Sequence, residues 1–166
     1  GVERDIDLAL DCGVDGVNLV VPASDRHVEG KVGTTRDEVV ETTVELAEYA
    51  KDHGLWLEVL GEDGSRADLD FLERLMGAAL DAGADRICYC DTVGHATPDR
   101  TLDAVSRLAE LGPTSTHTHD DLGLAVTNAL VSVSAGADLV HATVNGIGER
   151  AGNVALEEVA IALAHG

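Results

Sequence analysis

The sequence has 166 residues, of which 45% are hydrophobic and 2% aromatic, so it is long enough to bury one core built from aliphatic side chains. Its 31 acidic and 11 basic residues give a formal charge of −20, which argues against binding to nucleic-acid phosphates. The acids are spread along the chain and lysine occurs twice, a pattern typical of adaptation to high salt, where self-repulsion is screened.

The cysteines and the hydropathy indicate a soluble cytoplasmic protein. Cys12, Cys88 and Cys90 cannot all pair, and none lies in a Cys-x-x-Cys motif, which favours a reducing compartment. No apolar run reaches membrane-spanning length, and the first residues lack signal-peptide character. We therefore expect no membrane partner, and we expect Cys88 and Cys90 to be small core residues.

In chain order, an amphipathic stretch, a glycine and a short β-prone run recur as a unit. A glycine just past a helix end adopts the left-handed cap conformation that other residues resist. The pattern predicts a first helix and then five strand–helix units. The predicted strands cover residues 17–21, 55–59, 86–90, 114–117 and 139–143.

The segments between these runs carry helix signals. Thr35 opens a capping box, and Thr97 is a cap followed by proline at the first helical position. Residues 69–79 have apolar side chains at helical spacing. Asp121 and Asn153 are predicted to cap the last two helices.

Regular alternation of strands and helices predicts parallel strands with right-handed crossovers. Two architectures fit: a five-stranded doubly wound sheet, or part of a (β/α)8 barrel. A complete barrel needs about 250 residues, so length favours the doubly wound sheet. The motifs described below favour the barrel.

Polar and reactive residues follow each predicted strand. At the carboxyl ends of parallel strands, such residues form the functional edge of α/β proteins. They include His27 after the first run, Glu62 and Asp63 after the second, Thr92 and His95 after the third, His117, His119, Asp120 and Asp121 at the fourth, and the glycine loop 145–153 after the fifth.

His117 and His119 form the most specific pair. Strand side chains two apart point the same way, so these imidazoles can bind one divalent ion. The alternative is two histidines that share a hydrogen-bonded strand end. The aspartates at 120 and 121 and the amide of the glycine loop favour the metal.

Glu62 and Thr92 each have two interpretations. Glu62 is a candidate catalytic group that acts as a base or orients ligands, or it is a carboxylate placed at a helix start. Thr92 is a candidate donor to a substrate carboxylate, or an ordinary turn residue. His27, His53, His141 and His165 are expected to be surface or packing residues.

Four segments together resemble the 2-isopropylmalate, homocitrate and citramalate synthase family. They are LGEDGSRAD (60–68), CDTVGHATP (90–98), HTHDDLGLAVTNAL (117–130) and NGIGERAGN (145–153). The resemblance implies that residues 1–166 are a single portion of a catalytic domain, an HMGL-like metal-dependent (β/α)8 TIM barrel, at about strands 4 to 8. It also implies that a first-strand aspartate ligand and the catalytic base lie outside this chain.

The resemblance implies a Claisen condensation of acetyl-CoA with a 2-oxo acid. The implied partners are acetyl-CoA, the oxo acid and a second subunit of a homodimer. The implied cofactor is a divalent metal: Mn, Mg, Zn or Co. Asn18 stands where isopropylmalate synthases place a histidine near the substrate, which leaves the oxo acid open. The implied roles are metal ligation by His117, His119 and Asn153, catalysis by Glu62, and substrate binding by Thr92 and Asn18.

Two alternatives remain. A retro-aldol lyase acting on 3-hydroxy-3-methylglutaryl-CoA shares the His-x-His pair but uses a cysteine in the glycine loop, and residues 145–153 contain none. The chain is alternatively a metal-binding fragment without catalysis. Both are less favoured than the synthase.

Overall fold

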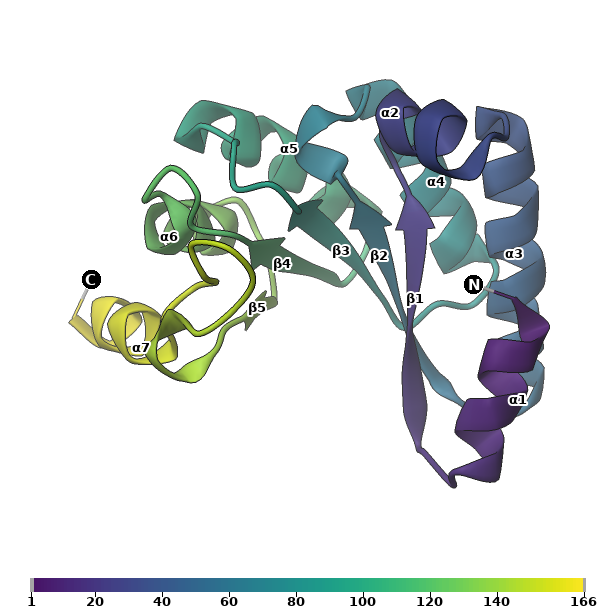
Figure 1. Ribbon diagram of the computed structural model, residues 1–166. Helices are drawn as coiled ribbons and strands as arrows, with labels where there is room; N and C mark the ends of the chain where they lie inside the picture. Colours follow the sequence, from purple (N-terminus) through teal and green to yellow (C-terminus); the bar gives the residue numbers. More distant parts are fainter. Residues whose placement is uncertain (1, 166) are drawn as a thin grey trace.

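The computed structural model describes residues 2–165 as a curved parallel sheet with helices along its outer side (Figure 1). The strands are β1 (Gly16–Pro22), β2 (Trp56–Glu62), β3 (Arg86–Asp91), β4 (Thr114–Thr118) and β5 (Leu139–His141). The helices are α1 (Glu3–Asp11), α2 (Asp25–His27), α3 (Arg36–Asp52), α4 (Leu69–Asp81), α5 (Pro98–Leu111), α6 (Ala125–Ser134) and α7 (Leu156–His165). Short helical turns cover η1 (Val28–Val32), η2 (Gly64–Arg66) and η3 (Val144–Gly146).

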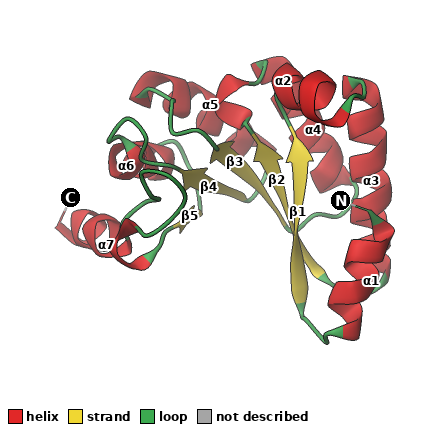
Figure 2. Ribbon diagram, viewed as in Figure 1, coloured by secondary structure: helices red, strands yellow, loops and turns green. Residues whose placement is uncertain are grey.

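The strands follow one another in space as they do in sequence. All four strand pairs are parallel, in the order β1-β2-β3-β4-β5. Each of α3, α4, α5 and α6 packs on the two strands that it connects, and neighbouring helices contact each other in chain order. The helices therefore form one outer layer, which Figure 2 shows in red around the yellow sheet.

This arrangement contradicts the doubly wound alternative. A doubly wound sheet places helices on both faces and reverses its strand order at a switch point. Here the order never reverses, and within residues 2–165 the helices lie along one face. A sequential parallel sheet with a single helical layer is the arrangement of a (β/α)8 barrel wall.

The two faces of the sheet have different chemistry. Side chains on the helical face, such as Leu57, Val59 and Ile87, are fully buried in one core with the helices. Burying such a side chain contributes about 1.5–3 kcal/mol. The opposite face carries polar and reactive side chains from the alternate positions, including Glu58 and His117. The core thus holds the strands in a register that aligns polar groups on the inner face.

The cap predictions were half right. Thr35 opens α3 with a capping box, and Thr97 caps α5 with proline at its start, as predicted. Asp121 and Asn153 were wrong, because α6 begins at Ala125 and α7 at Leu156. Asp121 instead bonds Arg150, and the backbone of Asn153 pairs with His119.

Other features concern the cysteines, the last strand and the helices. Cys88 and Cys90 are buried, as predicted, and Cys12 is exposed. The fifth strand ends at His141, two residues earlier than the β-prone run through residue 143. None of the helices described over residues 2–165 combines the length and the apolar character needed to cross a membrane.

Candidate metal and substrate site

The end of β4 brings two imidazoles together. His117 is half-buried on the inner face, and His119 follows it with 6% of its surface exposed. Their Nε2 atoms lie 3.2 Å apart, at hydrogen-bond distance, with ring centroids at 5.0 Å and planes at 73°. The two rings therefore converge on one point, as the alternation along a strand predicts. This contact fits the alternative of two histidines that share a hydrogen bond as well as a shared metal.

The surroundings keep His117 uncharged. Burial, followed by the neighbouring imidazoles of His119 and His141, lowers the pKa of His117 to about 4. A neutral imidazole has the free lone pair that a metal needs. At neutral pH His117 is thus uncharged, the form of histidine that can bind a metal.

Asn153 lies in the loop after β5, next to the end of β4. It pairs with His119 in an isolated antiparallel bridge, and the Asp120 N–H donates to the Gly152 carbonyl at 2.9 Å. A Cβ on Gly148 would lie 1.7 Å from Asn153 Oδ1, so only glycine leaves room for this amide. The backbone of Asn153 is therefore held beside that of His119, and Gly148 leaves room for the Asn153 carboxamide.

These donors fit one divalent ion. With metal–nitrogen bonds of about 2.1 Å, a 3.2 Å nitrogen separation corresponds to an angle of about 100° at the ion, within tetrahedral and octahedral ranges. Within residues 2–165, the buried atoms His119 Nδ1 and Asn153 Nδ2 have no hydrogen-bond partner. Neither atom is the one that would bind the ion, because the imidazoles face each other through Nε2 and an amide ligates through its oxygen. His117, His119 and Asn153 are the residues that could hold the ion.

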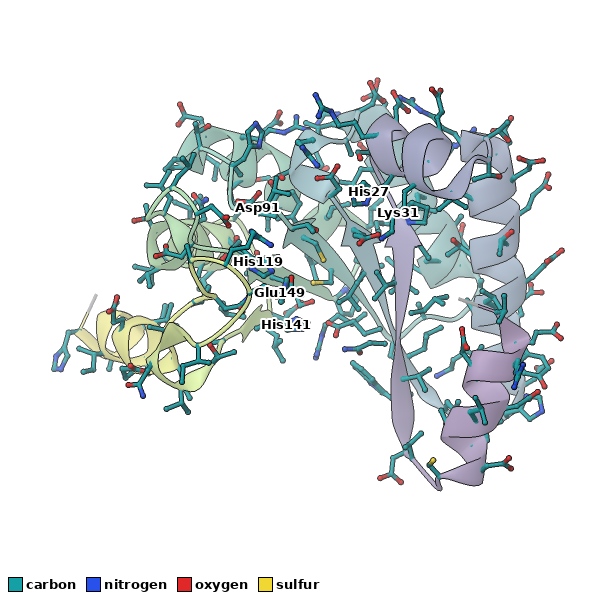
Figure 3. All side chains as sticks on the ribbon, in the orientation of Figure 1. His27, Lys31, Asp91, His119, His141 and Glu149 are labelled. Carbon is teal, nitrogen blue, oxygen red and sulfur yellow. The ribbon has the colours of Figure 1, made fainter. Side chains whose placement is uncertain are left out.

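Glu62 ends β2 at the same level of the sheet as His117. Gly61 pairs with Tyr89, so the next residues along the two strands, Glu62 and Cys90, lie side by side. Cys90 in turn pairs with His117 on β4. Lys31 Nζ donates to both Glu62 oxygens, at 2.7 and 2.8 Å. His27 Nδ1 lies 3.1 Å from Glu62 Oε2. The expectation that His27 is a surface or packing residue missed this contact. Figure 3 shows His27 and Lys31 close together on this side of the sheet.

Thr92 lies in the loop after β3. Its hydroxyl accepts a hydrogen bond from the Asp63 N–H at 2.8 Å, and its carbonyl accepts one from Arg150 Nη2 at 2.8 Å. The hydroxyl hydrogen remains available to donate to an anion. The turn interpretation and the substrate interpretation are therefore compatible.

Asn18 is not brought into this cluster. It is exposed on β1 and pairs with Glu58, whereas Pro22 pairs with Glu62. Four residues along a strand correspond to about 13 Å, so Asn18 lies well below the level of Glu62.

A second polar group, missed at the level of sequence, lies beneath the histidines. Glu58 has 3% of its surface exposed, accepts from Ser115 Oγ at 2.5 Å, and its Oε2 lies 3.2 Å from His141 Nε2. Burial acts to raise the pKa of Glu58, but the bonds from His141 and Ser115 outweigh it and lower that pKa. The bond to Glu58 raises the pKa of His141. The signal available was a glutamate at an inward position of a buried strand.

His141 and Glu58 also have a possible metal-binding neighbour in Cys88. Ligand atoms of these three residues lie within 4.8 Å of one another. His141 packs edge-on against His117, with ring centroids 5.6 Å apart. The Glu58–His141 pair therefore supports the ring of His117 from below.

The chain resembles curated proteins over nearly all of its length. It is 55% identical to a putative (R)-citramalate synthase CimA of Methanothermobacter thermautotrophicus, over 98% of this chain and 33% of that protein. It is 49% identical to the (R)-citramalate synthase CimA of Methanocaldococcus jannaschii, over 96% of this chain and 33% of that protein. A homocitrate synthase AksA of Methanopyrus kandleri is 48% identical, over 96% of this chain and 41% of that protein. The chain thus spans about a third of the length of the first two relatives.

Solved structures show the same fold. The HMG-CoA lyase of Bacillus subtilis superposes with a TM-score of 0.86 at 20% identity, covering 98% of this chain and 59% of that one. The HMG-CoA lyase of Brucella melitensis gives 0.84 at 21% identity, covering 98% and 62%. A family model described as HMGL-like matches residues 1–166. Because that match covers the whole sequence, the chain belongs to the HMGL-like family.

Proposed function

We propose that this chain is the larger part of the catalytic barrel of an acyltransferase that condenses acetyl-CoA with a 2-oxo acid, of the citramalate synthase type. The observation that carries the proposal is the convergence of His117 and His119 at 3.2 Å beside Asn153. Relatives named citramalate synthase, at 48–55% identity, support the reaction class.

In this proposal His117, His119 and Asn153 hold a divalent ion: Mn, Mg, Zn or Co. When bound, such an ion polarises the ketone of the oxo acid and stabilises the negative charge that develops on its oxygen. Thr92 donates its hydroxyl hydrogen to the carboxylate of the oxo acid. Glu62, held by Lys31, orients the groups that face the ketone.

We further propose that residues 1–166 correspond to strands 4 to 8 of a (β/α)8 barrel. Five consecutive parallel strands with one helical layer support this placement, as does coverage of about 60% of the lyase chains. The remaining strands then supply an aspartate ligand, and a separate segment supplies the base that deprotonates the acetyl-CoA methyl group.

The identity of the oxo acid rests on the relatives, because Asn18 lies outside the cluster of site residues. We propose pyruvate first, because most of the similar relatives are named citramalate synthase. The homocitrate synthase of Methanopyrus kandleri is nearly as similar, at 48% identity. An assay with several oxo acids therefore has to make the distinction.

The lyase alternative is not favoured. The lyase structures are 20–23% identical to this chain, a level that supports the fold alone. The loop of residues 145–153 has no cysteine, which the lyase resemblance requires.

We also propose that the full protein is a cytoplasmic homodimer adapted to high salt, with acetyl-CoA and the oxo acid as its ligands. The charge of −20 supports the salt adaptation. The free energy of unfolding is expected to rise between low and high KCl. A free energy of unfolding that does not depend on salt would contradict the proposal.

The test uses the full-length protein with Mn²⁺ and acetyl-CoA. Pyruvate, 2-oxoisovalerate and 2-oxoglutarate are added in turn, and the release of free thiol is followed. Thiol release with one oxo acid, lost in His117→Ala and retained in His53→Ala, is the expected result. His53 is a matched control because its ring is exposed and bonds the Tyr49 carbonyl. Mn²⁺ binding without thiol release from any oxo acid would favour a metal-binding fragment.

A further inference from the structure

Arg150 connects three loops at the rim of the sheet. Its Nε and Nη2 atoms donate to the two carboxylate oxygens of Asp121 at 2.7 and 2.8 Å. Nη2 also donates to the Thr92 carbonyl at 2.8 Å, and Nη1 lies 3.6 Å from Glu149. Bidentate arginine–carboxylate pairs fix geometry as well as charge.

Each of the connected loops carries a residue of the proposed site. Thr92 follows β3, Asp121 stands two residues after His119, and Arg150 stands three residues before Asn153. The contacts of Arg150 therefore span the segments whose relative position decides where the amide lies against the imidazoles. The direct backbone links at this junction are the His119–Asn153 bridge and the Asp120 N–H bond to Gly152.

The junction leaves little freedom for alternative packing. A Cβ on Gly94 would lie 2.4 Å from Asp121 Oδ2 and 2.8 Å from the His119 carbonyl. Arg150 itself has a φ of +57°, in the left-handed region that non-glycine residues rarely adopt. Strained backbone of this kind persists where surrounding contacts over-determine it, and such positions cluster at ligand sites.

We infer that Arg150 is a positioning residue that sets the distance between Asn153 and the His117–His119 pair. This inference rests on the proposed function. Nε and Nη2 of Arg150 are already bonded to Asp121 and Thr92, so these two nitrogens serve the loops. Arg150 acts through the loops that it ties together.

The test compares Mn²⁺ affinity and stability in the full-length protein. Arg150→Gly removes the guanidinium but relieves the left-handed backbone, so the metal-free melting temperature is expected to stay close to that of the wild type. The dissociation constant for Mn²⁺ is expected to rise about 10-fold or more, the usual effect of losing a residue that orients ligands. Arg150→Lys keeps the charge without the fork and is expected to give an intermediate value.

Arg74→Gln is the matched control. Arg74 Nη2 bonds Asp37 Oδ1 at 2.7 Å between α3 and α4, so its loss also removes one inter-element ion pair. Its Mn²⁺ affinity is expected to equal that of the wild type. The inference would be overturned if Arg150→Gly bound Mn²⁺ within about twofold of the wild-type affinity while His117→Ala bound no Mn²⁺. That result would leave the proposed function standing. Wild-type Mn²⁺ binding that is indifferent to His117→Ala would overturn both.

Discussion

Replacing Gly148 by alanine tests the contact that fixes Asn153. The added Cβ would lie 1.7 Å from Asn153 Oδ1 and 2.7 Å from its Cγ. Ordinary non-bonded contacts are about 3.5 Å, so the amide oxygen has to move by about 1.8 Å. A displacement of about 1 Å at a reacting centre already costs about 100-fold in rate. Overpacking of this kind also lowers the free energy of unfolding by about 1–3 kcal/mol.

The assay for Gly148→Ala is calorimetric titration with Mn²⁺, combined with chemical unfolding followed by circular dichroism. The expected result is a weaker Mn²⁺ affinity with the fold retained. Gly77→Ala is the control, because the nearest atom to its added Cβ is Leu111 Cδ1 at 4.0 Å. Since Gly77 lies within α4, alanine there is expected to stabilise by up to about 1 kcal/mol. Unchanged Mn²⁺ affinity in Gly148→Ala would refute the placement of the amide at the metal.

Three further predictions concern other parts of the molecule. The pKa of Glu58 is lowered in the folded state, so this residue stabilises the fold above its unfolded pKa of about 4.5, and that stabilisation is lost as the pH falls through the folded pKa. Glu58→Gln is therefore expected to make the free energy of unfolding depend less steeply on pH below about 4.5. An equally steep dependence in denaturant titrations of the variant would contradict this. Lys31→Met removes an ion pair to Glu62 and is expected to lower kcat in the thiol-release assay. The melting temperature is expected to change little, because Lys31 is more than half exposed. An unchanged kcat would argue against the role of Lys31. Leu57→Ala is expected to lower the free energy of unfolding by about 2–5 kcal/mol in urea, and a loss below about 1 kcal/mol would contradict its burial.

The strands and the histidine pair were accessible to reasoning from sequence because both depend on local periodicity. Alternation along a strand places His117 and His119 on one side, and the glycine junctions mark where each strand begins. The choice between barrel and doubly wound sheet was not local. It came from the resemblance to the synthase family, and the packing of the helices on one face supports it.

Contacts between distant loops could not be predicted in the same way. Asp121 and Asn153 have the residue types of helix caps, but Asp121 bonds Arg150, 29 residues away, and Asn153 pairs with His119. The capping role near Asp121 passes to its neighbour Asp120, whose Oδ1 accepts from the Ala125 N–H at 2.9 Å. Tertiary partners thus outweighed local propensity at both positions.

The basic residues around Glu62 illustrate the same limit. Lys31 lies on a π-helical turn after β1, a conformation that local sequence patterns do not signal and that is frequent at functional sites. Only the folded chain shows that this turn places Lys31 over the end of β2.

Anomalous scattering from crystals of the full-length protein grown with Mn²⁺ tests the shared-metal site most directly. We expect one strong peak within about 2.3 Å of the Nε2 atoms of both His117 and His119, next to the amide of Asn153. A peak at Glu58, Cys88 and His141 instead, or histidine rings bonded to each other with no ion between them, would contradict the account.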